Sequence, residues 1–237
     1  MKIICLKFIQ PLFVSLFILG VVSLAWPKFL VAASLDTDSD GDGYADDLEI
    51  NSGYSPFTAE VVKLTDSDVD QDGLSDYWEL KFKTDALNSD TDGDSYQDGL
   101  EIDQAFNPIS SSTRRLDRRL EIDLRTQKLF YFLAGQRFKE FTVSTGRKSM
   151  PTPTGNFKII NKNQKAWSKT YQLWMPYWLG LGNGSFGIHE LPIWPGGGRE
   201  GADHLGTPVS HGCIRLGVGS AEYLFKLVDI GTEVIIK

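Results

Sequence analysis

The chain has 237 residues, of which 41% are hydrophobic and 23% are charged, and its net charge is −7. These values are those of globular proteins, so they exclude a wholly disordered chain, and the length allows one or two domains. Residues 36–103 hold 21 acidic and 3 basic side chains, whereas the rest of the chain holds 10 and 21. The acidic part is therefore excluded as a nucleic-acid-binding surface, because it would repel phosphates.

Residues 1–33 have the pattern of an export signal. A basic start precedes an apolar stretch at 8–25, and small residues follow at 32–34. The apolar stretch is also long enough to cross a bilayer, so a cleaved signal peptide and an uncleaved membrane anchor both stay open. In either case we expect an exported protein, in the periplasm or the cell envelope. If Cys5 is removed or stays in the membrane, Cys213 is the one exported thiol, which indicates a reactive centre or an intermolecular pair.

An internal repeat follows within residues 34–103. Acidic side chains stand at positions 1, 3, 5, 9 and 12 of three twelve-residue segments, and the first two segments carry glycine at position 6. Alternate carboxylates let a tight loop surround one hard cation, the glycine permits the sharp turn, and the last glutamate closes the shell of ligands. The predicted calcium ligands are Asp38, Asp40, Asp42, Asp46, Glu49, Asp68, Asp70, Asp72, Asp76, Glu79, Asp90, Asp92, Asp94, Asp98 and Glu101.

The segments between these loops are too short for the paired long helices of an EF-hand. The repeats resemble the bacterial calcium-binding repeats related to thrombospondin type 3, and this resemblance implies a calcium ion with a structural role. A solvated acidic linker is the alternative, and three matches within one segment argue against it. Ser95 stands at position 6 of the third loop, where glycine is expected, which puts calcium binding by that loop in question.

Residues 104–118 are predicted to be a solvated linker, because Asn107-Pro108 and a Ser/Thr run interrupt regular structure and the sign of the charge changes. From 119 to 237 the hydrophobic period changes to two, which predicts a mainly β domain. One clear helix is expected at 220–228, with Ser220 as its cap. Strands are expected at 120–124, 128–133, 137–145, 156–160 and 233–236.

The sharpest chemical motif is Ser210-His211-Gly212-Cys213-Ile214-Arg215. A thiol in a short polar turn beside imidazole and guanidinium is expected to have a lowered pKa and to act as a nucleophile. The backbone N–H groups around Gly212 and Cys213 are candidates for stabilising an oxyanion. His189 offers a second imidazole upstream. From the motif alone, a buried structural cysteine is the open alternative.

The order of four motifs resembles the L,D-transpeptidase (YkuD-type) catalytic domain over about residues 119–237. Ser144-Thr145-Gly146 comes first, then 152–159, then Gly187-Ile188-His189, and finally the hexapeptide that contains Cys213. The resemblance implies an L,D-transpeptidase-like β-sandwich with one C-terminal helix.

The same resemblance implies the roles of the site residues. Cys213 would be the nucleophile, and His189 the general acid and base, with its ring oriented by the backbone carbonyl of Glu190. Arg215 would lie near the substrate or the oxyanion turn. The residues that would shape the pocket are Ser210, His211 and Gly212.

Two features depart from the family pattern. Glu190 stands where a glycine or small residue is more usual, and its charge is expected to change substrate access or to raise the pKa of His189. The long segment between His189 and Cys213 predicts an enlarged lid loop. The tryptophans that flank this region are expected to pack in the core or the lid rather than to bind substrate; they are Trp174, Trp178 and Trp194.

The reaction that the resemblance implies is acyl transfer on peptidoglycan stem peptides, through a Cys213 thioester, to form 3→3 crosslinks without a catalytic cofactor. Hydrolysis as an L,D-carboxypeptidase, or attachment of a protein to the wall, would use the same chemistry. Two other classes stay open. One is a zinc site, and the other is a calcium-dependent wall-binding module whose catalytic half has decayed. The zinc ligands would be His189, His204, His211 and Cys213.

Overall fold

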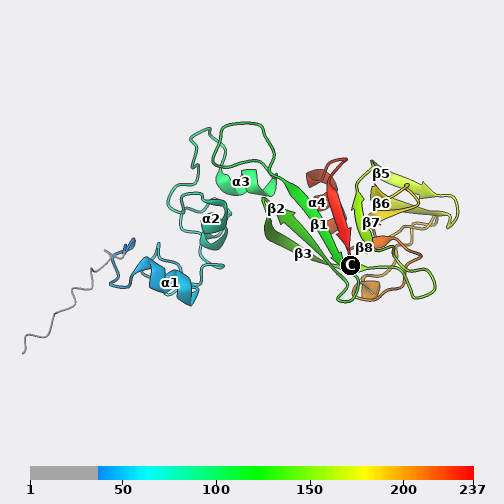
Figure 1. Ribbon diagram of the computed structural model, residues 1–237, viewed down its shortest axis with the longest axis horizontal. Coiled ribbons are helices and arrows are strands. Elements are labelled where there is room, and N and C mark those ends of the chain that lie inside the picture. Colours follow the sequence, from blue (N-terminus) through cyan, green and yellow to red (C-terminus); the bar gives the residue numbers. More distant parts are fainter. Residues whose placement is uncertain (1–36) are drawn as a thin grey trace, which may run out of the picture. The chain divides into compact units, whose positions relative to one another are not determined.

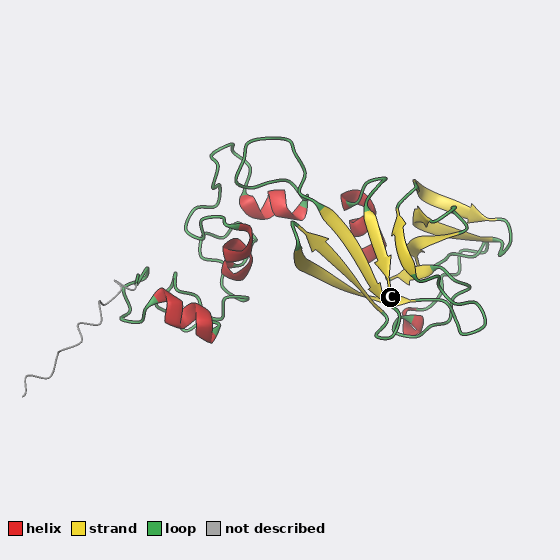
Figure 2. Ribbon diagram, viewed as in Figure 1, coloured by secondary structure: helices red, strands yellow, loops and turns green. Residues whose placement is uncertain are grey.

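The computed structural model describes residues 37–237, so the expected signal or anchor at 1–33 lies outside the described residues. Within 37–237, no helix is both long and apolar enough to cross a membrane. Short helices joined by loops occupy the first part of the described chain, and the strands occupy the second part (Figure 2).

Each acidic loop leads directly into one short helix. The helices are α1 (Asp46–Ser52), α2 (Asp76–Phe82) and α3 (Asp98–Asp103), and each begins at position 9 of its loop. The glutamate at position 12 therefore lies in the first helical turn, where an acidic side chain favours the positive end of the helix dipole. This arrangement turns position 12 back toward the loop that precedes it.

Nine strands form one continuous sheet in the order β4-β9-β1-β2-β3-β8-β7-β6-β5 (Figure 1). The long strand β3 joins the two halves, because its first part pairs with β2 and its last two residues pair with β8. The sequence predicted a β-sandwich, and the structure instead has one continuous sheet that curls. The strands are β1 (Arg118–Asp123), β2 (Lys128–Leu133), β3 (Gln136–Ser144), β4 (Gly155–Lys158), β5 (Asn161–Ser168), β6 (Leu173–Leu181), β7 (Phe186–Glu190), β8 (Ile214–Leu216) and β9 (Glu233–Ile236).

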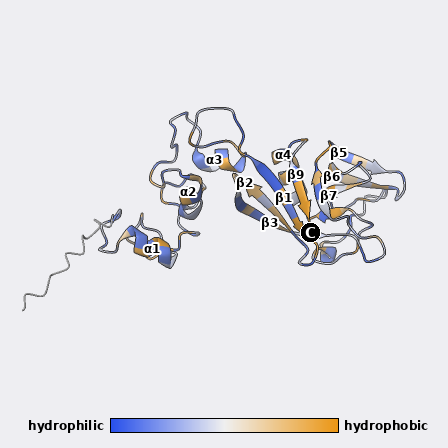
Figure 3. Ribbon diagram, viewed as in Figure 1, coloured by the Kyte–Doolittle hydropathy of each residue, from blue (hydrophilic) through white to orange (hydrophobic). Residues whose placement is uncertain are grey.

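The core follows the two-residue period of the first strands. Leu120 and Ile122 of β1 are fully buried, and alternate residues of β2 and of the hydrophobic strand β9 lie in the same cluster (Figure 3). Helix α4 (Ser220–Leu227) packs on β6 and β7 and buries Leu224 completely. Each such leucine stabilises the fold by roughly 1.5–3 kcal/mol. The expected C-terminal helix is confirmed, but Ser220 is its first residue and not its cap, because Gly219 stands at the cap position.

The second and third acidic repeats share this core. The ring of Trp78 lies 5.0 Å from that of Phe138 in β3, and Phe82 also contacts Phe138. The segment expected to be a linker is held near its start, where Ala105 is fully buried and its carbonyl accepts from the N–H of Leu116 at 2.8 Å. Apolar side chains therefore fix a segment whose polar residues alone indicated a solvated linker. The domain boundaries stay a prediction.

Candidate active site and cation-binding loops

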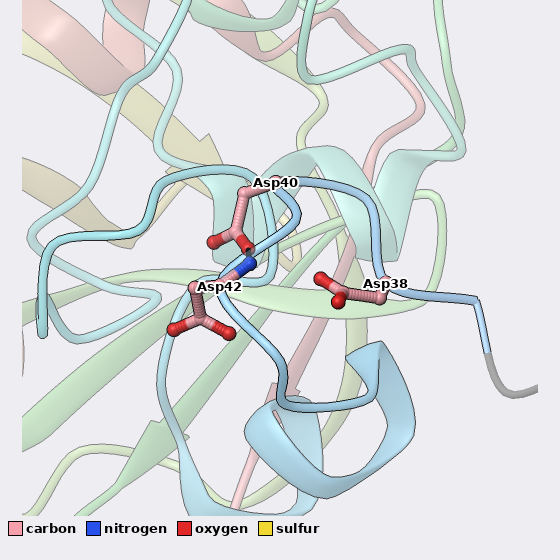
Figure 4. Close-up of side chains that lie close together, drawn as sticks. All are labelled: Asp38, Asp40 and Asp42. Atoms are coloured by element: carbon pink, nitrogen blue, oxygen red, sulfur yellow. Dashed lines mark hydrogen bonds between the residues drawn. The ribbon is translucent and has the colours of Figure 1, made fainter.

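Positions 1, 3 and 5 of each acidic loop gather carboxylate oxygens. In the loop before α1, Asp38, Asp40 and Asp42 each have an oxygen within 4.8 Å of the other two (Figure 4). The other two loops gather their oxygens in the same way; their residues are Asp68, Asp70 and Asp72, and Asp90, Asp92 and Asp94. The structure thus brings together the three ligand positions predicted at the start of every loop.

Positions 3 and 12 carry buried oxygens that have no hydrogen-bond partner among the described residues. These residues are Asp40, Asp70, Asp92, Glu49, Glu79 and Glu101. Burial, followed by repulsion from Asp70, raises the pKa of Glu79 to about 8, and burial with repulsion from Asp94 raises that of Glu101 to about 7. Unpaired buried acceptors are costly, and a set of hard oxygen donors is what calcium prefers. These residues fit a calcium ion.

The carboxylates at position 9, which were predicted to be calcium ligands, make hydrogen bonds with other residues of the protein. Both oxygens of Asp46 accept from Ser39, its N–H at 2.8 Å and its hydroxyl at 2.7 Å. Asp98 accepts in the same way from Thr91, and both oxygens of Asp76 are also engaged. The position-9 carboxylates therefore hold the second residue of each loop against the helix start, and direct ligation from position 9 finds no support in these contacts.

Ser95 adopts the left-handed backbone conformation, with φ of 78°, as Gly73 does at the same position of the second loop with φ of 93°. This conformation costs a non-glycine residue about 1 kcal/mol or more. We expect Ser95→Gly to raise the melting temperature and to lower the calcium concentration needed for half-saturation. The matched control is Gly73→Ser, where a side chain meets open space, so the change adds only strain and both effects should reverse. Equal melting curves for both variants would contradict this account.

Two parallel strands position the predicted catalytic residues. Strand β7 is buried throughout and ends with His189-Glu190, and it pairs with β8 so that Ile188 faces Ile214 and His189 faces Arg215. Cys213 directly precedes β8, and the backbone of Gly187 lies close to its sulfur. The thiol and the imidazole therefore come from neighbouring strand segments, although 23 residues separate them in the sequence.

A cleft of about 230 Å³ contains both groups. Its polar lining comes from β7, from β8 and the turn before it, and from the loop between the two strands, and its apolar lining comes mainly from β6 and the same loop. The lining residues are Tyr171, Leu173, Met175, His189, Pro192, Trp194, Glu200, His211, Cys213 and Arg215.

His189 is held in one orientation. Its Nδ1 lies 2.6 Å from the backbone carbonyl oxygen of Glu190, the contact that the family resemblance implied. A carbonyl only accepts, so Nδ1 donates and Nε2 is left as the acceptor of the neutral ring. The indole of Trp178 stacks on the imidazole at 5.9 Å. Burial lowers the pKa of His189 to about 4, against the opposing effect of the Glu190 carbonyl.

The expected low thiol pKa is wrong for this structure. Burial raises the pKa of Cys213 above its ordinary value, although the Gly187 N–H and the charge of Arg215 oppose the shift. The partly buried thiol and the buried imidazole line the same cleft, and its apolar surroundings favour the uncharged form of each.

The turn before Cys213 is braced by its own hydroxyl groups. Ser210 Oγ donates to the carbonyl of Cys213 at 2.6 Å and accepts from the N–H of Gly212 at 3.1 Å. Thr152 Oγ1 donates to the carbonyl of Gly212, whose φ of 111° favours glycine. The predicted oxyanion role of the Gly212 N–H is therefore not supported, since that group is already engaged. Ser210 is fully buried and shapes the turn rather than the cleft surface.

Arg215 lies in the cleft, but a carboxylate that the sequence reading missed holds it. Arg215 Nη1 donates to Glu200 Oε1 at 2.6 Å, and the same oxygen lies 2.5 Å from His204 Nδ1. Glu200 is only 7% exposed. In the sequence Glu200 is marked only as part of an isolated Arg-Glu pair in a glycine-rich loop. The position of such a pair in the sequence does not indicate which strand its side chains will contact.

The carboxylate of Glu190 does not line the cleft. It pairs with Arg199 and accepts from the N–H of Gly219 at 3.2 Å. The expectation that its charge raises the pKa of His189 is wrong, because the carboxylate is paired with Arg199 and burial dominates the imidazole. Glu190 contributes to the site in two ways: its backbone carbonyl orients His189, and its carboxylate holds the loop through Arg199.

The aromatic residues divide between packing and the cleft. Trp178 is buried on His189, and Trp174 packs on Trp167, as expected for packing roles. Trp194, by contrast, is 44% exposed and lines the cleft. His211 is also exposed there, with its ring 4.6 Å from that of Tyr171.

The proposed zinc ligands do not gather into a metal site. Within residues 37–237, sets of three or more close ligand atoms occur at the three aspartate triads. His189 uses Nδ1 for a carbonyl, and His204 uses Nδ1 for Glu200. The four residues His189, His204, His211 and Cys213 therefore do not offer a converging tetrahedral set.

Comparison with known proteins finds similar proteins that are named as L,D-transpeptidases. A Bacillus subtilis protein named "Putative L,D-transpeptidase YciB" is 27% identical over 124 residues, which cover 49% of this chain and 64% of that protein. The chain thus spans less than two thirds of the length of this relative. A solved L,D-transpeptidase structure from Stackebrandtia nassauensis is 28% identical with a TM-score of 0.44, covering 53% of this chain and 57% of that one. One from Enterococcus faecium is 27% identical with a TM-score of 0.41, covering 51% and 50%.

A family model described as the L,D-transpeptidase catalytic domain, YkuD, matches residues 117–236. These residues begin at the strand that opens the sheet and end within its last strand, and they include the cleft with Cys213 and His189. The chain belongs to the YkuD family of L,D-transpeptidase catalytic domains.

Proposed function

We propose that the protein is an exported L,D-transpeptidase that crosslinks peptidoglycan stem peptides. The observation that carries this proposal is that one cleft is lined by both Cys213 and His189, and that Nε2 of His189 is left as an acceptor. Family membership supports the reaction class. Peptidoglycan lies outside the cytoplasm, which agrees with the export signal expected at 1–33.

In the first half-reaction the sulfur of Cys213 attacks the carbonyl carbon of an L–D peptide bond, while the thiol proton passes to Nε2 of His189. The C–N bond then breaks, and the leaving D-residue amine takes that proton from the imidazole. The product is a thioester that keeps the acyl group activated, so no nucleotide is needed. The backbone N–H of Cys213 remains as the predicted donor to the oxyanion.

In the second half-reaction a side-chain amine of a neighbouring stem, as the free base, attacks the thioester carbonyl. A C–N bond forms, the C–S bond breaks, and the amine proton passes through His189 to the departing sulfur. The protein then returns to its uncharged thiol–imidazole pair. Attack by water in place of the amine would give L,D-carboxypeptidase products, and attack by a protein amine would give wall attachment.

Acyl-enzyme formation tests the proposal. The full chain is incubated with a stem tetrapeptide or with imipenem, and its intact mass is recorded. We expect a covalent adduct on Cys213 and, when an acceptor stem is added, a crosslinked dimer of the peptides. A protein that forms no adduct with either donor would be the decayed wall-binding module instead.

We also propose that the acidic loops hold calcium as a structural ion. The unpaired oxygens at positions 3 and 12, together with the triad oxygens, are the residues that would hold it. Bound calcium would neutralise carboxylates that otherwise repel one another. Because α2 packs on β3 through Trp78 and Phe138, we infer that the stabilising effect reaches the catalytic sheet.

Calcium is expected to bind with two or three ions per chain and to raise the melting temperature. At a hundred times the dissociation constant, each ion adds about 2.7 kcal/mol to the free energy of unfolding. Magnesium should compete poorly, because it prefers a strict octahedron. Calorimetric titration and thermal melting measure both effects.

The Glu79→Gln variant should bind one calcium ion fewer per chain than the unaltered protein. Asp66→Asn, which neutralises an exposed carboxylate outside the loops, should lose none. The absence of any heat up to millimolar calcium would refute the calcium proposal and leave the catalytic one untouched.

A further inference from the structure

Glu200 lines the same cleft as Cys213 and His189. Its backbone N–H donates to the carbonyl of Pro192 at 3.0 Å, which fixes the loop, and its side chain is only 6% exposed. The preceding residue, Arg199, pairs with Glu190, which follows His189. Two adjacent loop residues of opposite charge thus attach the loop to both strands. The carboxylate of Glu200 is therefore held firmly and has little freedom to swing away.

The two oxygens of Glu200 have different surroundings. Oε1 accepts from Arg215 Nη1 and lies 2.5 Å from His204 Nδ1. Oε2 has no hydrogen-bond partner within residues 37–237, and it is not fully enclosed by the protein. Since Glu200 lines the cleft, Oε2 is the oxygen that a molecule in the cleft can reach.

The ion pair between Arg215 and Glu200 removes a barrier to cations in the cleft. Arg215 alone would repel a positively charged group that approached Cys213, but its ion pair with Glu200 cancels that charge. Two half-exposed aromatic rings of the same cleft, Tyr171 and Trp194, add faces that attract cations. A carboxylate oxygen accepts a charge-assisted hydrogen bond from an ammonium group, and aromatic rings attract the same cation.

We propose that Glu200 is a specificity-determining residue, which binds the ammonium form of the acyl acceptor through Oε2 before transfer. This inference rests on the proposed transpeptidase function. The carboxylate recognises the acceptor and takes no part in bond making; the ammonium proton passes to water before the free amine attacks. Acyl donors that arrive without a cationic group near Cys213 should not depend on Glu200.

The test separates recognition from chemistry with two nucleophiles. The acyl-enzyme is formed from a stem tetrapeptide and then offered either a stem peptide with a free side-chain amine or hydroxylamine. An alkylamine is cationic at neutral pH, since such amines titrate near 10.4, whereas hydroxylamine is uncharged there. Glu200→Gln keeps an oxygen for Arg215 and removes the negative charge. We expect the KM for the stem acceptor to rise about tenfold or more, with the rates of acylation and of hydroxylamine attack changed less than threefold.

Asp203→Asn is the matched control, because it neutralises an exposed carboxylate three residues away in the same loop and should leave every rate unchanged. The wild-type protein provides a readout that needs no variant: the stem acceptor should half-saturate at a concentration at least about tenfold below that of hydroxylamine. Equal KM values for both nucleophiles, or a Glu200→Gln protein that slows hydroxylamine as much as the stem acceptor, would overturn the inference. Failure of the wild type to acylate at all would refute the proposed function instead.

Discussion

Cys213→Ala is expected to abolish acyl-enzyme formation while leaving the fold intact. Alanine removes only the sulfur, and the brace of the turn depends on the Ser210 hydroxyl and on backbone groups rather than on the thiol. No other group in the cleft has both the nucleophilicity and the place to form a thioester. The intact mass of the variant should therefore show no adduct with a stem tetrapeptide or with imipenem, at any incubation time.

The control for this result is Cys5→Ser, which removes the other cysteine of the chain. This variant should be acylated at the same rate as the unaltered protein, because the acyl group is expected to form on Cys213. Thermal melting of both variants shows that folding is retained. Residual crosslinking by Cys213→Ala, or loss of the adduct in Cys5→Ser, would show that the nucleophile has been assigned to the wrong residue.

His189→Ala is expected to slow acylation by a factor of about 10²–10⁴, the range that one well-placed acid–base group contributes. The raised pKa of the Cys213 thiol makes this dependence strong, since little thiolate exists without a base. His211→Ala should cost less, because that ring lines the cleft from an exposed position. His204→Ala should be nearly silent in acylation, because its contact is with Glu200 rather than with the thiol.

The pH dependence gives the same assignment a second readout. The base must be unprotonated, and the pKa of His189 is lowered to about 4 by burial, so kcat/KM for acylation should hold from neutral pH down to about 5 and fall below that. An acid limb that begins at a clearly higher pH would indicate that a group other than His189 is the base. A silent His189→Ala together with an inactive His204→Ala would reverse the assignment.

The sequence revealed the regions whose hydrophobic pattern is simple. Leu120 and Ile122 alternate with polar residues, and α4 has a clear helical spacing, so both were predicted with nearly the right bounds. Strand β6 gave no such signal, because it is buried along both faces at its end and contains Pro176 and Gly180. Its burial comes from strands on either side, which are distant parts of the chain.

The site was predictable only as far as local motifs reach. Cys213 and His189 each stand in a recognisable motif, and the structure places them in one cleft. Glu200 and the engaged N–H of Gly212 could not be foreseen, since each depends on a contact that only folding creates. The raised thiol pKa was missed for the same reason. Neighbouring residues in the sequence indicated polar surroundings, whereas burial is set by the packed strands.

The parallel pairing of β7 with β8 has an evolutionary consequence. The distance between the proposed nucleophile and the proposed base is set by the register of Ile188 against Ile214, and it does not depend on how many residues connect the strands. The connection can therefore gain, lose or exchange residues while the reacting atoms keep their separation. Residues 192–207, which supply Trp194 and Glu200 to the cleft, form such a connection. Selection can alter the choice of acceptor there and preserve the chemistry inherited with the strands.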